Sequence, residues 1–273
     1  MKIISSPEQL KQHLKTLDGS VGFVPTMGAL HEGHLSLIRT SKSQNDFTVV
    51  SIFVNPTQFL KGEDLDKYPR KDEADKKICE LAGVDVLFFP QVEDIYGQDE
   101  VSIEAPNVRG YILEGASRPG HFSGVLTVVN KLLHVTNPTR AYFGKKDAQQ
   151  LFLIQQMVKN FFMDVEIVPV DTVRESDGLA LSSRNVYLSK EERAEALKIS
   201  ASLNLARVMI TQGILDVEEI KSKMREKLSP LHVEYVEILS RDFEYIKEVR
   251  VGESIVLVEA LVGTTRLLDN SWL

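Results

Sequence analysis

The stretch GFVPTMGALHEGHLSLI, residues 22–38, passes from one kind of secondary structure to another. The apolar run at 21–24 predicts a buried strand, and the turn that follows contains Gly28. Beyond this turn, apolar residues recur every three or four positions, which is typical of an amphipathic helix. We therefore expect a strand, a tight turn and a helix, with His31 and His34 at the amino terminus of the helix.

The same alternation continues along the chain. Short β-branched runs predict strands at 21–24, 47–54, 84–89, 140–143 and 165–170. Stretches of helical periodicity lie between them, at 33–43, 70–83, 122–136 and 147–162. Strands and helices in alternation predict an α/β fold with a Rossmann-like doubly wound parallel sheet. Ligands of such sheets bind beyond the carboxyl ends of the strands, near a switch in strand order.

The pattern changes near residue 185. Residues 189–230 have helical periodicity and are rich in Lys and Glu, and residues 232–240 and 254–268 have the character of strands separated by turns. We therefore expect two domains, a Rossmann-like domain over 1–184 and a smaller α+β domain over 185–273.

Composition narrows the class of protein. The chain has 273 residues, 43% of them hydrophobic, and a formal net charge of −7 with no long basic run, so we expect no nucleic-acid partner. It contains no apolar run of about 18 residues and no signal-peptide pattern, so we expect no membrane partner and a cytoplasmic location. The single cysteine, Cys79, excludes an intramolecular disulfide, and a buried structural thiol is favoured over a reactive one.

The two histidines have three interpretations. A helix amino terminus attracts anions, and the Thr26 hydroxyl could extend such a site. The positive end of the helix dipole favours neutral imidazoles, whereas a bound polyphosphate would favour the imidazolium form of His31 and His34. The alternatives are two surface histidines or a zinc pair, but zinc needs further ligands and the chain has no HExxH or CxxC motif.

Other stretches carry suitable chemistry for an anionic ligand. In GKKD, residues 144–147, two lysines at a helix start conflict with the helix dipole, which favours an anionic ligand over simple solvation, and Lys146 could reach a phosphate as a point charge. Asn55, Gln58 and Gln150 are neutral amides that could hold a carboxylate. The SSRN stretch, 182–185, offers hydroxyls and a guanidinium, although a surface loop would have the same composition.

Several ordered motifs together resemble one family. PTMGALHEGH is similar to the HxGH signature of the nucleotidyltransferase superfamily. The further motifs VNPTQF, YPR, LEGASRPGHFSGVLTVVNKL, YFGKKDAQQ and LALSSRN resemble the pantothenate synthetase family. The resemblance implies ATP-dependent condensation of (R)-pantoate with β-alanine to give pantothenate, AMP and pyrophosphate through pantoyl adenylate. It also implies a homodimer, ATP and pantoate binding by the first domain, and a lid role for the second.

The resemblance assigns roles to individual residues. His34 is the proton donor and acts with His31 and Lys146 on the phosphates as pyrophosphate leaves. ATP is bound by Met27, Gly28, Ala29, Leu30, His31, Glu32, Gly33, His34, Gly144, Lys145, Lys146, Asp147, Val173, Leu181, Ser182, Ser183 and Arg184. Pantoate is bound by Asn55, Gln58 and Gln150, and Gln58 also contacts β-alanine.

The metal assignment rests on one carboxylate. Mg²⁺ is expected with ATP, and Asp75 is the candidate contact, whereas Ala74 occupies a position that is acidic in some relatives. A solvated acidic helix start is the alternative for Asp75. Arg118 and His121 either lie near the site or belong to a structural loop.

Two rival functions remain open at this point. The first is another HxGH nucleotidyltransferase, which would release a stable nucleotide product where a ligase releases free AMP. The second is a non-catalytic nucleotide-binding module, which turnover would exclude.

Overall fold

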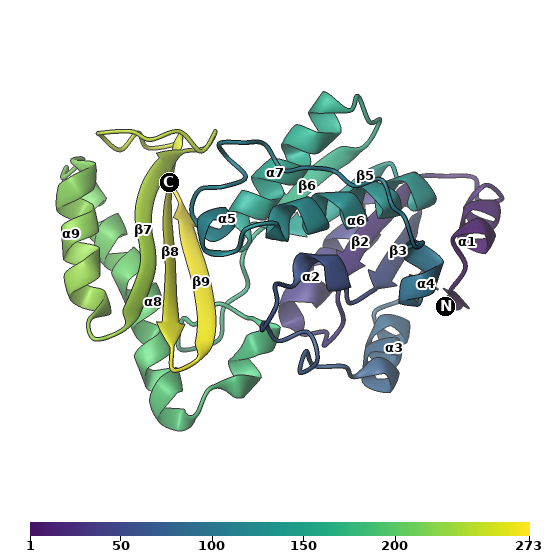
Figure 1. The fold of residues 1–273 in the computed structure, drawn as a ribbon, viewed down its shortest axis with the longest axis horizontal. Coiled ribbons are helices and arrows are strands. Elements are labelled where there is room, and N and C mark those ends of the chain that lie inside the picture. The colour runs from purple at the N-terminus through teal and green to yellow at the C-terminus, as the bar shows by residue number, and fades with distance from the viewer. The chain divides into compact units, whose positions relative to one another are not determined.

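The computed structural model describes residues 1–273, which form two compact units (Figure 1). The first unit comprises residues 1–145 and 150–171, and the second comprises residues 146–149 and 172–273.

The first unit is built on a parallel sheet. Its strands are β1 (Lys2–Ile4), β2 (Val21–Thr26), β3 (Phe47–Ile52), β4 (Val86–Phe88), β5 (Arg140–Gly144) and β6 (Glu166–Val170). Its helices are α1 (Pro7–Leu14), α2 (Glu32–Gln44), the short 3-10 helix η1 (Pro56–Gln58), α3 (Asp72–Leu81), α4 (Val92–Ile95), α5 (Glu114–Ser117), α6 (His121–Thr136) and α7 (Ala148–Asn160), of which α7 begins in the second unit.

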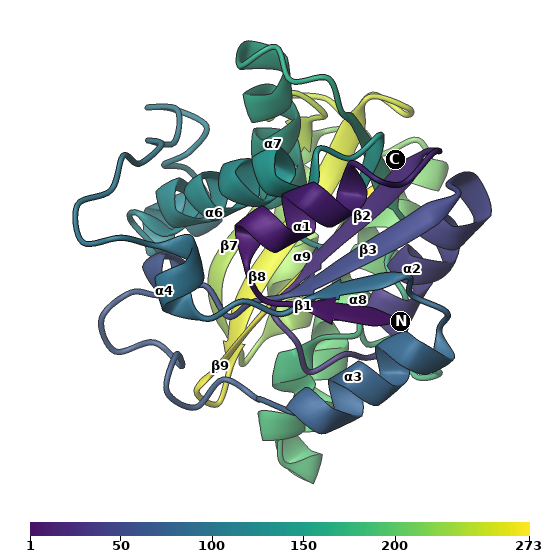
Figure 2. The same ribbon diagram turned by 90° about the vertical axis from the view of Figure 1, so that its right-hand side faces the viewer.

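The strand order confirms the predicted fold class. The six strands pair in parallel in the order β1-β4-β3-β2-β5-β6, so the order reverses between β2 and β5. Figure 2 shows α1 and α6 on one side of the strands and α3 on the other. The carboxyl ends of β2 and β5 therefore lie side by side at the switch in strand order, where this architecture places its ligands.

A buried cluster beneath α2 and α3 explains why these helices cover the sheet. Val24, Val50 and Leu87 come from three neighbouring strands and pack with Ile38 of α2 and Cys79 of α3. These apolar side chains recur at strand and helix periods along the sequence, so burying them on one face drives the layers together. Cys79 has the buried position expected from the sequence.

The second unit is a three-stranded antiparallel sheet with helices. Its elements are the 3-10 helix η2 (Ser183–Tyr187), α8 (Lys190–Thr211), α9 (Val217–Leu228), β7 (His232–Ser240), β8 (Ser254–Val262) and β9 (Thr265–Trp272). The strands pair in the order β7-β8-β9. Apolar side chains of α8, α9 and the strands form its own core, among them Ile199, Ile220 and Val258. This is the smaller α+β unit that the sequence predicts.

The division between the units lies at residue 172, earlier than the boundary expected near 185. Arg174 donates two hydrogen bonds to the carboxylate of Asp269 on β9, at 2.6 and 2.8 Å. Arg193 of α8 bonds to Glu175 and Asp177. These ion pairs join the segment after β6 to the second unit, and sequence periodicity does not reveal such contacts.

Two further findings concern single elements. Strand β1 is not predicted by the pattern of the sequence, because it has only three residues and is defined by pairing with β4. Among the helices, none combines the length and the apolar character that a membrane crossing requires.

Candidate active site

The turn after β2 has an unusual backbone. Gly28 and Ala29 both adopt left-handed conformations, with φ of 84° and 50°. A left-handed alanine is strained by about 1 kcal/mol or more, so neighbouring contacts must hold it. Thr26 stabilises the start of the turn, because its hydroxyl donates to the Ser51 carbonyl and accepts from the Gly28 N–H. The expectation that this hydroxyl extends an anion site is therefore wrong, since its proton is already used.

Asp75 on α3 holds the same turn. Its two carboxylate oxygens accept hydrogen bonds from the N–H groups of Ala29 and Leu30, at 2.7 and 2.8 Å. The residue is 1% exposed. Burial raises the pKa of Asp75, although the two backbone hydrogen bonds act in the opposite direction. This carboxylate therefore fixes the backbone that leads into His31.

The surroundings of Asp75 do not form a protein metal site. Both of its oxygens are engaged by the backbone, and nowhere in the structure do three His, Cys, Asp or Glu side chains gather as a metal would require. Magnesium favours oxygen ligands in an octahedral arrangement that leaves room for several waters. The contacts of Asp75 favour a positioning role over that of a metal ligand.

His31 and His34 lie at the start of α2, as the sequence predicts. His31 is the N-cap residue, and its Nδ1 accepts from the N–H of Gly33 at 3.2 Å. His34 is in the first turn, and its Nδ1 accepts from the N–H of His31 at 3.2 Å. The two ring centroids are 4.1 Å apart. The imidazoles thus replace the Ser and Glu of an ordinary capping box and lie against each other at the positive end of the helix.

The side chains of the other residues in the predicted ATP-binding stretch make different kinds of contact. Glu32 pairs with Arg39 further along α2 and is exposed, so its acid group belongs to the helix surface. Leu30 is buried in the cluster beneath α2. Met27 accepts a hydrogen bond at Sδ from the Nε2 of Gln58, at 3.1 Å. This contact joins the turn after β2 to the segment after β3.

That segment carries the predicted amides. Asn55 follows β3 and Gln58 ends η1, and both are buried. The Nδ2 of Asn55 donates to the Oε1 of Gln58 at 3.1 Å and to the Gly124 carbonyl at 3.2 Å. The structure therefore brings these amides together and next to the turn that contains Met27.

Arg118 and His121 form a buried network around the backbone of Gln58. The Arg118 guanidinium bonds to both carboxylate oxygens of Glu63, at 2.6 and 2.7 Å, and to Glu114 at 2.8 Å. The Nδ1 of His121 lies 2.8 Å from the Gln58 carbonyl, which can only accept, so this nitrogen carries the proton. The Nε2 of His121 then accepts from Arg118 at 3.0 Å. Both residues support the site through Gln58.

The carboxyl end of β5 provides Gly144 and Lys145. The Lys145 N–H donates to the Val170 carbonyl, and the Lys145 ammonium pairs with Asp171 at 2.6 Å. Gln150 follows in the first turns of α7. These residues lie at the same edge of the sheet as the turn after β2, because β2 and β5 are parallel neighbours.

The other predicted ATP residues belong to the second unit. Lys146 pairs with Asp147 at 3.2 Å, and its carbonyl accepts from Asn270 at 2.7 Å. The Val173 carbonyl accepts from the Leu181 N–H at 3.0 Å. Ser182 caps η2, whose first residues are Ser183 and Arg184.

The sequence interpretation missed Tyr96 and Gly124, which both bond to Asn55. Gly124 lies in the quoted motif LEGASRPGHFSGVLTVVNKL and Tyr96 lies in none of the motifs, but nothing in the sequence indicates that either residue contacts Asn55. Tyr96 is separated from Asn55 by 41 residues, so only the fold brings them together.

Comparison with known proteins identifies the family of the chain. A family model described as pantoate-beta-alanine ligase matches residues 2–272. The chain is 65% identical to the pantothenate synthetase of Sulfurimonas denitrificans over 273 residues and 58% identical to that of Campylobacter fetus, in each case covering all of both chains.

Solved structures give the same result. The crystal structure of pantothenate synthetase from Thermus thermophilus matches with a TM-score of 0.95 at 41% identity, covering 100% of this chain and 99% of the other. The pantoate-beta-alanine ligase of Francisella tularensis, solved with a β-γ ATP ligand and β-alanine, matches with a TM-score of 0.83 at 38% identity, covering 100% and 97%. The chain therefore belongs to the pantoate-β-alanine ligase family.

Proposed function

We propose that the chain joins (R)-pantoate to β-alanine through pantoyl adenylate, using the residues placed above. The carboxylate oxygen of pantoate attacks the α-phosphorus of ATP, the bond to the β-phosphate oxygen breaks, and pyrophosphate leaves. The amine of β-alanine then attacks the acyl carbon, the bond to AMP breaks, and the amine proton passes to solvent. The products are pantothenate, AMP and pyrophosphate.

One observation carries the assignment of the first step. The Nε2 of Gln58 contacts the Sδ of Met27 in the turn that precedes His31. An amide suited to a carboxylate and a helix amino terminus suited to phosphates are thereby held side by side. That is the pairing that transfer of a nucleotide to a carboxylate needs, because the reacting groups must be oriented together.

We assign the individual roles from this geometry together with the family resemblance. His31 and His34 donate to the phosphates and stabilise the charge that develops as pyrophosphate leaves. Gln58 and Gln150 hold pantoate, and Gln58 also contacts β-alanine. From the second unit, Lys146 and the Leu181–Arg184 segment contribute to ATP binding, and we propose that this unit acts as a lid.

ATP is the nucleotide substrate, and we propose that it binds with Mg²⁺. Since the residues around Asp75 do not form a metal site, the ion would be held chiefly by the phosphates, where it neutralises charge. The use of ATP also supports a cytoplasmic location.

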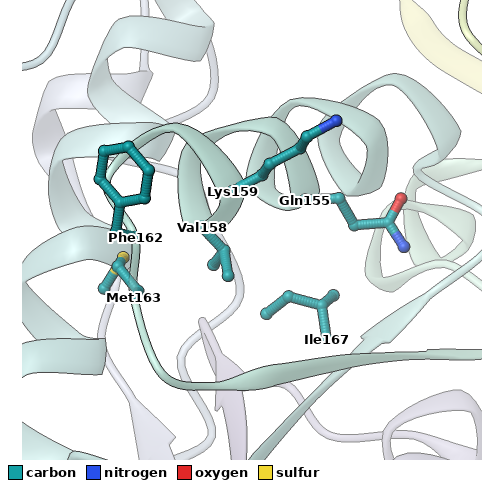
Figure 3. Close-up of a pocket in the computed structure, with 6 residues that line it drawn as sticks. All are labelled: Gln155, Val158, Lys159, Phe162, Met163 and Ile167. Carbon is teal, nitrogen blue, oxygen red and sulfur yellow. The ribbon is translucent and has the colours of Figure 1, made fainter.

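We further propose that the chain forms a homodimer, as the family resemblance implies. Strand β6 is an edge strand, and near it Phe162 is 93% exposed. A pocket of about 370 Å³ lies beside this residue, between α7 and β6 (Figure 3). It is lined by Gln155, Val158, Lys159, Phe162, Met163 and Ile167. Exposed apolar surface of this kind is available to a second copy of the chain, and sedimentation of the wild type and of Phe162→Glu tests the assignment.

Isotope exchange tests the chemistry. With ATP, Mg²⁺ and pantoate but no β-alanine, the enzyme should exchange labelled pyrophosphate into ATP. Intact mass should show no pantoyl group on the protein, because the one cysteine is buried on α3 and no serine stands in a GxSxG motif. Exchange that requires β-alanine, or a covalent acyl-protein, would overturn the proposed mechanism. Release of a stable nucleotide product without free AMP would favour a different nucleotidyltransferase.

A further inference from the structure

We propose that Asn55 and Tyr96 are positioning residues that fix the direction of the Gln58 side-chain amide. Their hydrogen bonds turn the NH₂ group of Gln58 toward the substrate and keep its oxygen occupied within the protein. The proposal rests on the proposed function, in which Gln58 holds a carboxylate.

The direction of the Gln58 side-chain amide is set, through Asn55, by a backbone carbonyl group. The Gly124 carbonyl on α6 can only accept, and it receives a hydrogen bond from Asn55 at 3.2 Å. The atom of Asn55 that faces Gly124 is therefore its nitrogen, Nδ2. The second proton of that nitrogen points to Gln58 at 3.1 Å, so the atom of Gln58 that receives it is the oxygen, Oε1.

The other side of Asn55 is held by two hydroxyl groups. Tyr96 and Thr57 both donate to the Oδ1 of Asn55, at 2.8 and 3.0 Å, and their own oxygens lie 3.1 Å apart. Asn55 is 1% exposed and uses both of its donor protons and both acceptor positions within the protein. The side chain of Asn55 therefore acts on the substrate through Gln58, in contrast to the direct contact that the sequence suggests.

The backbone of Gln58 is held as firmly as its side chain. Its carbonyl accepts from His121 at 2.8 Å, within the network of Arg118. Helix α6 approaches so closely that a Cβ on Gly124 would lie 2.4 Å from the Thr57 oxygen and 2.8 Å from the Gln58 nitrogen. The amide can therefore neither turn over nor move away without breaking several buried hydrogen bonds.

This arrangement has a chemical consequence for recognition. The Nε2 of Gln58 meets only the weak acceptor Sδ of Met27, so its protons are available to a stronger acceptor. A carboxylate accepts and does not donate. An amide turned the other way would place oxygen against oxygen, so the orientation favours a hydrogen-bond acceptor, such as a carboxylate oxygen, at this position.

A double-mutant cycle on the full chain tests the proposal. The measurement is the dissociation constant of pantoate by isothermal titration without ATP, which does not depend on turnover. Tyr96→Phe removes one hydrogen bond and should weaken pantoate binding by about three- to tenfold. Asn55→Ala leaves buried partners unsatisfied and should weaken it by about ten- to a hundredfold. In the Gln58→Ala background, neither change should have a further effect beyond about twofold.

A role independent of Gln58 gives a different result. If Asn55 and Tyr96 merely support the fold or touch pantoate directly, each change will weaken binding by the same factor in both backgrounds, and the proposal is overturned. If the wild-type protein neither binds pantoate in this titration nor carries out pantoate-dependent pyrophosphate exchange, the proposed function fails instead. ATP affinity should stay at the wild-type value in Tyr96→Phe, which excludes general damage.

Tyr142→Phe is the matched control. Tyr142 is buried and Tyr96 is half-buried, and the hydroxyl of Tyr142 bonds to Asn45 and Gln44 rather than to residues of the site. Pantoate affinity should not change in this variant. An equal loss in Tyr142→Phe and Tyr96→Phe would also overturn the proposal.

Discussion

The backbone N–H of His31 donates a hydrogen bond to the Nδ1 of His34, at 3.2 Å. A ring nitrogen that accepts a hydrogen bond from a backbone N–H carries no proton of its own, so the neutral ring of His34 has its proton on Nε2. His31 has the same tautomer, because its Nδ1 accepts from Gly33. Forming an imidazolium at either residue would break a bond that starts α2. Without a bound phosphate, the local fold therefore favours neutral hydrogen-bond donors at both histidines, as the helix dipole does.

Removing one of these donors should slow the first step. His34→Ala deletes the Nε2 donor and one cap of α2, and pantoate-dependent pyrophosphate exchange should fall by about 10²- to 10³-fold. The control is His134→Ala, which removes an exposed histidine late in α6 and should leave the rate unchanged. Wild-type exchange in His34→Ala would contradict the role assigned to it.

Asp75→Asn should separate a positioning role from a metal role. The carboxylate of Asp75 now accepts hydrogen bonds from two backbone N–H groups. The NH₂ group of asparagine would face one of them, donor against donor, so the turn at Ala29 should shift. ATP affinity should fall by about tenfold or more, by the same factor with Mg²⁺ and with a chelator. A loss seen only with Mg²⁺ would show metal binding. Asp72→Asn, in the exposed part of the same helical turn, is the control.

His121 should make the fold sensitive to mild acid. Burial lowers the pKa of His121 below its ordinary value of 6.5, despite the nearby Glu114 carboxylate. The unfolded chain therefore binds a proton at a pH where the folded chain does not, and stability falls as the pH drops below about 6.5. His121→Asn should flatten this slope in urea unfolding measured between pH 7 and pH 5. The exposed His134→Asn should keep it, and an unchanged slope in His121→Asn would contradict the prediction.

Cys79 should be unreactive in the folded protein. Burial raises the pKa of its thiol to about 12, and the Asp75 carboxylate acts in the same direction. Native protein should resist alkylation by iodoacetamide at pH 8, whereas protein in urea should react fully. The same shift predicts that stability falls as the pH rises from about 9 toward 12, since only the unfolded chain ionises readily. Rapid labelling of the native thiol would disagree with this assignment.

Gly124→Ala should damage the pantoate site more than the fold elsewhere. A methyl group at this position meets backbone atoms of Thr57 and Gln58, which cannot yield as a flexible side chain would. We expect weaker pantoate binding with little change in ATP affinity, measured by titration of each ligand. Gly120→Ala is a useful comparison, because open space surrounds that position although its φ of 90° adds strain. Equal effects on both ligands would argue against the localised role.

The fold class and the position of the two histidines can be predicted from short-range patterns in the sequence. Alternating apolar runs, turn residues and helical periods suffice for the parallel α/β fold, and the spacing of His31 and His34 predicts their place at a helix start. Such features are local because they depend on side-chain periodicity and on the backbone preferences of a few neighbouring residues.

Other features depend on contacts between residues far apart in the sequence. Asp75 bonds to Ala29 across 46 residues, and Tyr96 bonds to Asn55 across 41. Asp75 is an acidic residue in the first turn of a helix, and such a residue can either hold a turn or bind a metal. Nothing near Asp75 in the sequence distinguishes the two roles. Strand order decides which segments meet, and hydrogen-bond direction then decides what each polar atom can offer a substrate. Local patterns in the sequence therefore suffice to identify candidate site residues. The tertiary structure decides whether each of them acts as a donor, as an acceptor or as a support for another residue.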